Sequence, residues 1–268
     1  MDRTLNLKPR HGEQTQRPVT VLATDPDADQ LIPLHAHSRG QLVHAISGVM
    51  IVRAAGGAWV VPPGRALWVP AQVQHEIQTA GSVAMRTVFV EPGLRPGLGD
   101  SCRVIPVEPL LCQLILRALD FAMDYPLGGR EERTMQLILD EIESAPTLSL
   151  HVPMPNHARL GQLCRQFIAE PAQAATLDGW AMQLHMNPRT LARLFLRETG
   201  MNFGAWCRQV RLLLSLPRLV AGASVLEVAL DHGYNSPSAF TAMFRKELGV
   251  PPVTYMRKQP KQARPAAD

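Results

Sequence analysis

Cysteine, aromatic residues and long apolar runs are all scarce in this chain of 268 residues. Aromatic residues make up only 5% of it, and no apolar stretch approaches the roughly 20 residues that a membrane-spanning helix needs. Residues 1–18 lack the apolar core of a signal peptide. The four cysteines have neither the pattern of a disulfide framework nor the close spacing of a zinc site, which favours reduced thiols. We therefore expect a cytoplasmic protein that does not enter the membrane.

Charge is divided unevenly along the chain. Residues 157–268 contain 14 Lys and Arg against 7 Asp and Glu, a net charge of +7, whereas residues 1–156 contain 13 against 16, a net charge of −3. This asymmetry is typical of a chain in which one domain meets a polyanion and the other does not. The length also favours two domains. The basic half is therefore the candidate for nucleic-acid binding.

Two stretches of the basic half, residues 177–198 and 225–248, share one plan. Each has a short apolar-periodic segment, a polar turn and a second segment whose apolar residues recur three and four positions apart. This spacing indicates a helix with one buried face. Each second segment opens with a capping residue and a proline, Asn187-Pro188 or Ser236-Pro237, and a glycine follows it. The plan predicts two helix-turn-helix units, with a plain helical bundle as the alternative.

The outward faces of the two second helices carry cationic and small polar side chains. These side chains can donate hydrogen bonds to phosphates and base edges. A merely solvated basic face would not explain why arginines lie on the same side of two matching helices. The side chains on these faces are Arg189, Thr190, Arg193 and Arg197 in the first unit and Ser238, Thr241, Arg245 and Lys246 in the second.

The C-terminal hundred residues resemble the DNA-binding domain of bacterial AraC/XylS-type transcription regulators. The resemblance covers about residues 158–258 and rests on residues 187–212 and 223–257, including the closing pattern Gly233-Tyr234, Phe240, Phe244, Gly249, Pro251 and Tyr255. It implies that one long helix, predicted at 203–219, joins two units whose second helices enter successive major-groove segments on one DNA face. Pro217 departs from this pattern, and we expect it to kink that helix or to end it early.

The family pattern also implies roles for single positions. The places that face bases in that family correspond here to Arg189, Ala192 and Arg193 in the first reading helix and to Ser238, Thr241 and Ala242 in the second. Because arginine can pair with guanine through two hydrogen bonds, we predict that the first reading helix supplies most of the base specificity. Arg245 and Lys246 are then phosphate contacts that anchor the second helix. Arg197 and Arg208 complete the predicted DNA-binding set.

The acidic half predicts a β-rich domain. Short β-branched runs separated by proline and glycine turns fill residues 31–90, which favours an antiparallel sandwich or a small barrel. Within them, His35-x-His37-x3-Gln41 and the later His75 resemble the two cupin motifs. The sequence departs from those motifs in three places: Gln41 stands where that family has Glu, Gln72 where it has Gly, and Thr79 where it has Asn.

The histidines of this domain are the candidate metal ligands. His35 and His37 alternate along one strand and so share a face, where they can form a three-imidazole site with His75 for a divalent transition metal. Three interpretations stay open: a metal site reused for sensing, a metal-free effector pocket lined by histidines, and an enzymatic cupin. Gln41 is a poor ligand, and Glu76 should point away from His75, so no carboxylate has an evident role as a base. No cofactor is required for the predicted function.

Two amphipathic segments, residues 108–124 and 131–144, are expected to be helices. They cover the barrel or, as the family resemblance favours, pair with the same helices of a second copy, and both can hold together. Three prolines in residues 146–155 indicate a linker. We therefore divide the chain into a disordered tail (1–18), a cupin-like sensor domain (19–100), a helical linker or dimerisation segment (101–145), a linker (146–156), a double helix-turn-helix domain (157–258) and a tail (259–268).

The sequence thus predicts an α+β chain with an N-terminal cupin-like β-barrel, a helical segment, and a C-terminal all-α domain with two helix-turn-helix units. We predict a sequence-specific transcription regulator, not an enzyme, that binds double-stranded DNA as a homodimer and responds to an unidentified small-molecule or metal effector. RNA polymerase is a candidate partner. The competing hypotheses are a cupin-type metalloenzyme with an accessory helical domain and a non-specific nucleic-acid binder.

Overall fold

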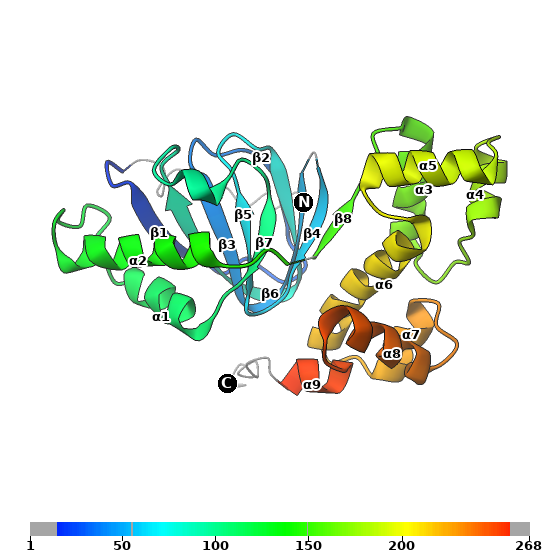
Figure 1. The fold of residues 1–268 in the computed structure, drawn as a ribbon. Helices are drawn as coiled ribbons and strands as arrows, with labels where there is room; N and C mark the ends of the chain where they lie inside the picture. Colours follow the sequence, from blue (N-terminus) through cyan, green and yellow to red (C-terminus); the bar gives the residue numbers. More distant parts are fainter. Residues whose placement is uncertain (1–14, 55, 149, 258–268) are drawn as a thin grey trace, which may run out of the picture.

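The computed structural model describes residues 15–54, 56–148 and 150–257, which form a sheet domain and a helical domain side by side (Figure 1). The sheet domain occupies the left of the figure, with two helices across it, and the helical domain lies at the right. The short strand β8 (His151–Pro153) runs between them. In the described part of the chain, no helix combines the length and the apolar character needed to cross a bilayer. The predicted α+β architecture is confirmed.

Two long strands form the centre of the sheet. β3 (Gly40–Ala54) and β6 (His75–Val90) pair in antiparallel fashion along nearly their whole length. The first half of β3 also pairs with β5 and the second half with β4, while β6 pairs with β2 near its start and with β1 near its end. Each long strand therefore has one set of partner strands along its first half and another along its second half. The other strands are β1 (Val19–Thr24), β2 (Leu31–His35), β4 (Gly57–Val61), β5 (Arg65–Val69) and β7 (Arg103–Pro106).

An irregularity interrupts the pairing of the long strands near their middle. The register shifts between Ala45 and Val49 of β3, and Gly48 has a φ of 73° there. A Cβ atom at this position would meet the carbonyl oxygen of Ser82, so glycine is required. Among the described residues the hydrogen-bonded order β1-β6-β3-β4-β8 does not return to β1. The predicted β-rich domain is confirmed, but its sheet is open rather than a closed barrel.

The helices α1 (Pro109–Ala118) and α2 (Arg130–Ser144) pack on one face of the sheet. Their apolar stripes meet Leu42 and Trp68 in a single core cluster. The predicted second helix is confirmed, whereas the first, expected at 108–124, ends at Ala118. The residues after it turn back to the sheet, where Tyr125 is buried and its hydroxyl donates to the carbonyl oxygen of Val19 at 3.1 Å. This contact between distant parts of the chain gives the segment a partner that helical periodicity does not reveal.

The helical domain consists of two short helical units on either side of one longer helix, α6 (Figure 1). α6 continues past Pro217 to Val220, so the expected early end is wrong. Pro217 lacks the N–H that would bond one turn back, but the helical hydrogen bonds resume after it, where Ala221 N donates to the carbonyl oxygen of Pro217 at 2.9 Å. The helices are α3 (Ala158–Ala169), α4 (Leu177–Gln183), α5 (Pro188–Thr199), α6 (Phe203–Val220), α7 (Val225–Asp231), α8 (Pro237–Leu248) and α9 (Pro252–Arg257).

The segment that joins the domains is itself part of the sheet. β8 pairs with β4, and the ring of His151 stacks on Trp59 with centroids 4.5 Å apart. In α6, the indole Nε1 of Trp206 donates to the carbonyl oxygen of Pro153 at 2.8 Å. The segment predicted as a linker, residues 146–156, therefore contains an ordered strand that attaches α6 to the sheet domain. Pro153 lies in β8 at the edge of the sheet, where a missing N–H is tolerated.

Candidate DNA-binding surface and histidine cluster

Both predicted reading helices begin at a side-chain cap and end at a left-handed glycine. In α5, Asn187 Oδ1 accepts a hydrogen bond at 2.9 Å from the backbone N–H two residues later, and Gly200 has a φ of 70°. In α8, Ser236 Oγ accepts one at 3.2 Å from the N–H three residues later, and Gly249 has a φ of 77°. These bonds satisfy N–H groups that a helix start otherwise leaves unpaired. The predicted capping is confirmed in both units.

Removal of the Asn187 cap should cost about 1 kcal/mol of stability. Asn187→Ala deletes the acceptor and leaves an N–H at the start of α5 without a protein partner. The matched control is Asn235→Ala, because this exposed asparagine lies just before the cap of α8 and caps no helix itself. Its replacement should change the stability by less than about 0.5 kcal/mol. Urea unfolding followed by circular dichroism measures both values, and equal losses would contradict the role of the cap.

Each reading helix packs on its own unit through the apolar face predicted from its periodicity. Leu191 and Phe195 of α5 are fully buried, and so are Phe240 and Phe244 of α8. The ring of Phe195 lies 5.6 Å from that of Trp206, which places α5 directly against α6. Burial of aromatic side chains supplies most of the packing energy of such small units. The opposite faces of α5 and α8 are therefore the ones available to a partner.

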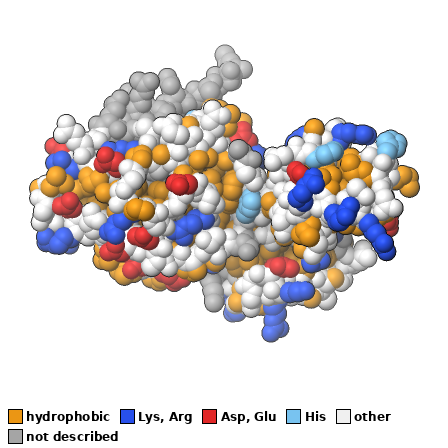
Figure 2. Space-filling model, turned by 45° about the horizontal axis from the view of Figure 1, so that its top comes forward, with side chains coloured by type: hydrophobic (Ala, Val, Ile, Leu, Met, Phe, Trp, Pro, Cys, Tyr) orange, Lys and Arg blue, Asp and Glu red, His pale blue; other side chains and the backbone are white. Residues whose placement is uncertain are grey.

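The predicted DNA-contacting side chains of α5 and α8 lie on those open faces, and Arg208 of the same set lies on α6. All four arginines of the set in α5 and α6 are exposed, although Arg197 pairs with Glu198 at 3.3 Å and Arg208 faces Glu247 at 3.9 Å. Figure 2 shows several Lys and Arg side chains spread over the helical domain at the right, where acidic side chains are few on this face. The exposed members are Arg189, Thr190, Arg193, Arg197, Arg208, Ser238, Ala242, Arg245 and Lys246, and the half-buried ones are Ala192 and Thr241.

The sheet domain brings the predicted histidines together at one end of β6. His35 ends β2, and His75 begins β6 opposite it. The ring centroids of His35 lie 4.8 Å from His37 and 4.3 Å from His75. One nitrogen of each of the three rings lies within 4.8 Å of the others, and no acidic residue or cysteine belongs to this group among the described residues. The structure therefore brings together the three histidines that the sequence motif singled out, and their role as metal ligands stays a prediction.

Hydrogen bonds fix which nitrogen of two of these rings faces the cluster. His35 Nδ1 donates to the carbonyl oxygen of Pro33 at 2.7 Å, and His75 Nδ1 donates to that of Val73 at 2.8 Å. Because a carbonyl oxygen can only accept, each neutral ring keeps Nε2 as a lone pair. Burial lowers the pKa of His75 to about 4, with smaller contributions from the two neighbouring imidazoles. Neutral imidazole is the form that binds a metal.

Gln41 contacts the cluster where the cupin motif would supply a carboxylate. Its side-chain Nε2 lies 2.5 Å from Nε2 of His75, and both residues are buried. An amide N–H that donates to this nitrogen occupies the lone pair that a metal would use. Glu76, the next residue after His75, instead pairs with Arg53 at 2.9 Å, away from the cluster, as predicted. The chemistry of the cluster is therefore ligation or hydrogen bonding by imidazole, and within the described ranges no carboxylate joins it.

Paired helix-turn-helix units on one chain with a sheet domain are the organisation of a transcription regulator that carries its own ligand-binding domain. Two family models match the chain: an AraC-like ligand binding domain over residues 17–175 and a helix-turn-helix domain over residues 180–258. The HTH-type transcriptional regulator NimR of Escherichia coli (strain K12) is 30% identical over 266 residues, which is 97% of each chain. The protein belongs to the AraC family of DNA-binding transcription regulators.

Two of the solved structures that match the chain have lower identities. ToxT of Vibrio cholerae O395 is 11% identical, covers 91% of this chain and 99% of its own, and has a TM-score of 0.39. The DNA-binding domain of AdpA, solved in complex with a target DNA, is 28% identical over 36% of this chain and 87% of its own, with a TM-score of 0.34. The assignment to the family rests on the two family models and on NimR.

Proposed function

We propose that this regulator senses a divalent transition metal ion held in the sheet domain by His35, His37 and His75. The observation that carries the proposal is the convergence of three imidazole nitrogens within 4.8 Å of one another. Hydrogen bonds to Pro33 and Val73 orient two of the rings, as outer partners of metal-binding histidines commonly do. Three protein ligands leave coordination positions open for water or for part of an organic effector.

The contact of Gln41 with His75 favours a second candidate, a metal-free effector pocket. In that version the Gln41 amide satisfies His75, and the histidines offer hydrogen bonds to an organic molecule. Both candidates describe an effector-responsive regulator rather than an enzyme. The pairing of Glu76 with Arg53, outside the cluster, supports this view because no other carboxylate of the described residues belongs to the cluster to act as a base.

Metal analysis of the protein purified without a histidine tag separates the two candidates. We expect about one ion per chain, lost in His37→Ala and retained in His157→Asn, a control that keeps the helix cap at that position. Gln41→Glu should tighten binding of Co²⁺ or Zn²⁺ at least about tenfold, because a carboxylate replaces a poor ligand. Footprinting on the DNA beside its own gene, with and without the ion, tests whether the ion alters DNA binding. No binding of either ion to the wild-type protein or to Gln41→Glu would leave the metal-free pocket as the explanation.

For the DNA contact, we propose that α5 supplies base readout through Arg189 and Arg193, while α8 anchors the protein through Arg245 and Lys246. Two arguments support this division. The arginines of α5 are exposed at the N-terminal and central turns of their helix, where long side chains reach base edges. On the equivalent turns, α8 offers only short side chains, and its two cations lie in the last turn.

We further propose that the protein acts as a homodimer through the outer face of α1 and α2, with residues 19–100 as the sensor and 157–258 as the DNA-binding domain. Leu110 and Leu137 stand exposed on these helices, although the other leucines and isoleucines of the two helices are buried or half-buried. Exposed leucines on neighbouring helices suit a two-fold contact in which each helix pair meets its own copy.

A further inference from the structure

One arginine of α6 contacts segments of both helix-turn-helix units, the first formed by α4 and α5 and the second by α7 and α8. Arg211 donates through Nε to the carbonyl oxygen of Pro171 at 2.9 Å and through Nη2 to that of Gln173 at 3.2 Å. Both carbonyls belong to the loop at 170–176, just before α4. The same guanidinium lies over the ring of Tyr234, in the turn between α7 and α8, at 5.7 Å from the ring centre. Arg211 therefore bridges the two units.

The loop before α4 and the turn of the second unit also approach each other directly. Gly233 of that turn has a φ of 74°. A Cβ atom added to it would lie 2.9 Å from the carbonyl oxygen of Ala172 and 3.1 Å from Nη2 of Arg211. Glycine is required here for two reasons, the left-handed backbone and the close approach. The turn of the second unit therefore packs on the loop of the first.

Aromatic side chains extend this contact to both reading helices. On one side, the ring of Tyr234 packs edge-on against Phe240 of α8, with centroids 5.5 Å apart. On the other side, the Arg211 guanidinium lies 5.3 Å from the ring centre of Phe167 in α3. The ring of Phe167 lies 5.9 Å from that of Trp206, against which α5 packs. A continuous series of packed side chains thus joins α5 to α8 through Arg211.

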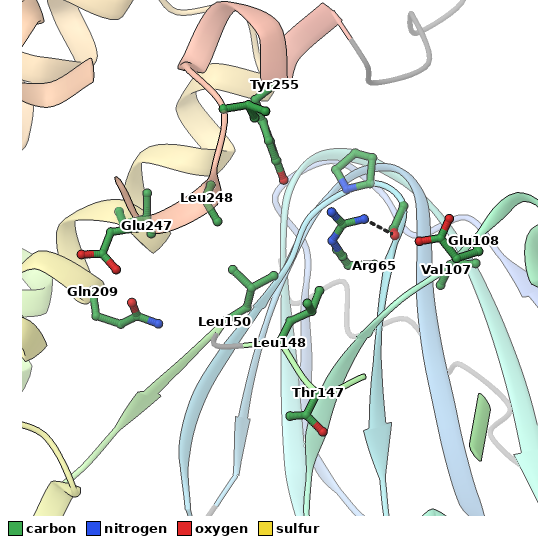
Figure 3. Close-up of a pocket in the computed structure, with 14 residues that line it drawn as sticks. Arg65, Val107, Glu108, Thr147, Leu148, Leu150, Gln209, Glu247, Leu248 and Tyr255 are labelled. Atoms are coloured by element: carbon green, nitrogen blue, oxygen red, sulfur yellow. Dashed lines mark hydrogen bonds between the residues drawn. The ribbon is translucent and has the colours of Figure 1, made fainter. Parts of the chain in front are cut away.

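Two features limit how firmly the rest of the molecule orients the second unit. α6 leads into that unit past Pro217, which lacks the N–H of one helical hydrogen bond. On the side of the sheet domain, the unit borders a cavity of about 660 Å³, lined among others by Arg65 of β5, Leu248 of α8 and Tyr255 of α9 (Figure 3). Side chains beside a cavity have more room to shift than closely packed ones. The contact through Arg211 is therefore well placed to hold α8 in a fixed orientation relative to α5.

We infer that Arg211 is a positioning residue for DNA binding, which fixes the orientation of α8 relative to α5 and so sets the spacing of the two DNA segments that the protein reads. Arginine suits this role because a planar guanidinium can donate to carbonyl oxygens while its faces stack on aromatic rings. Lysine is a compact charge without this planar shape and cannot make both kinds of contact at once. The inference goes beyond the proposed function, since it concerns how the two helices are held and not which side chains touch bases.

Duplexes with altered spacing test the inference on the full-length protein. The operator is first selected from a library of random-sequence duplexes, and one base pair is then inserted between the two segments that footprinting shows to be protected. The insertion moves the second segment by about 3.4 Å and turns it by about 35°. For the wild-type protein we expect an affinity loss of at least about tenfold, because rigidly linked readers cannot engage both segments when the geometry does not match.

Arg211→Lys keeps the positive charge but loosens the contact between the units. Its affinity for the selected operator should fall severalfold, because the readers are no longer held in place, and the inserted base pair should then cost less than about threefold. Tyr234→Phe should behave like the wild type, because it keeps the ring and removes a hydroxyl that has no hydrogen-bond partner among the described residues. Arg218→Lys is the matched control on α6, since this arginine pairs with Asp231 of the second unit alone. It should also keep the wild-type response.

The response to spacing separates positioning from a simple loss of stability. A protein that is only destabilised loses affinity for both duplexes by the same factor, so its sensitivity to the insertion stays that of the wild type. Equal affinities of the wild-type protein for the two duplexes, or an undiminished loss on insertion in Arg211→Lys, would overturn the inference. These measurements depend neither on metal binding nor on which helix reads the bases, so they stand apart from tests of the proposed function.

Discussion

Trp206→Ala should lower the free energy of unfolding of the helical domain by about 3–5 kcal/mol, the cost of removing a large aromatic side chain from a core. Trp206 is completely buried. Its ring lies 5.9 Å from Phe167 and 5.6 Å from Phe195, so the substitution opens a cavity where α3, α5 and α6 meet. It also leaves the carbonyl oxygen of Pro153 without its indole donor. Urea unfolding followed by far-ultraviolet circular dichroism measures the loss.

Trp206→Phe separates packing from the hydrogen bond. Phenylalanine keeps an aromatic ring in the core but cannot donate to Pro153, so we expect a smaller loss of about 1–3 kcal/mol. The segment around β8 should also exchange its backbone hydrogens faster in this variant, because its bond to α6 is gone. A loss below about 1 kcal/mol for Trp206→Ala would contradict the central place of this side chain.

Arg193→Ala should reduce affinity for the operator by about 1–3 kcal/mol, or roughly 5- to 150-fold, while affinity for random DNA falls much less. The reason is that Arg193 is exposed on the open face of α5, in the position that faces bases in this family. Electrophoretic mobility shifts with operator and scrambled duplexes at one salt concentration give the ratio of affinities. The same loss on both duplexes would show that Arg193 contacts phosphate only.

Lys246→Ala supplies the matched comparison on α8. Lys246 is exposed in the last turn of that helix, where a phosphate contact is expected. Its loss should weaken all duplexes alike and reduce by about one the slope of log affinity against log salt concentration. A change in the preferred base sequence would instead place Lys246 in the groove.

The helical elements show what local sequence signals can predict. The starts and ends of α5 and α8 agree with the prediction, because caps, prolines and periodic apolar residues all act within one or two turns. The end of α1 was missed because Tyr125 bonds to Val19, over a hundred residues earlier. β8 was missed for a similar reason: its partner strand β4 is distant in sequence, and its own short stretch is rich in proline.

The candidate sites also differ in how far local sequence signals predict them. The spacing of His35, His37 and Gln41 and the motif around His75 predicted a cluster, and the structure brings these side chains into contact. Their role as ligands stays a prediction, as do the single DNA contacts on α5 and α8. Arg65 and Tyr255, by contrast, both line a cavity between the two domains although they are 190 positions apart in the sequence. They share this cavity only because the second helix-turn-helix unit packs beside the sheet domain, so no local sequence pattern predicts it.

The double attachment of β8 has a practical consequence for anyone who wishes to work with half of this protein. A shortened chain that stops at residue 145 would uncover the backbone of β4 and the ring of Trp59, and so would offer neighbouring molecules an edge on which to aggregate. A chain that starts at residue 157 would lack the acceptor of the Trp206 indole. A cut placed before Pro146 leaves the strand on the C-terminal fragment, and one after Pro155 leaves it on the N-terminal fragment, so either choice deprives one piece of a native contact.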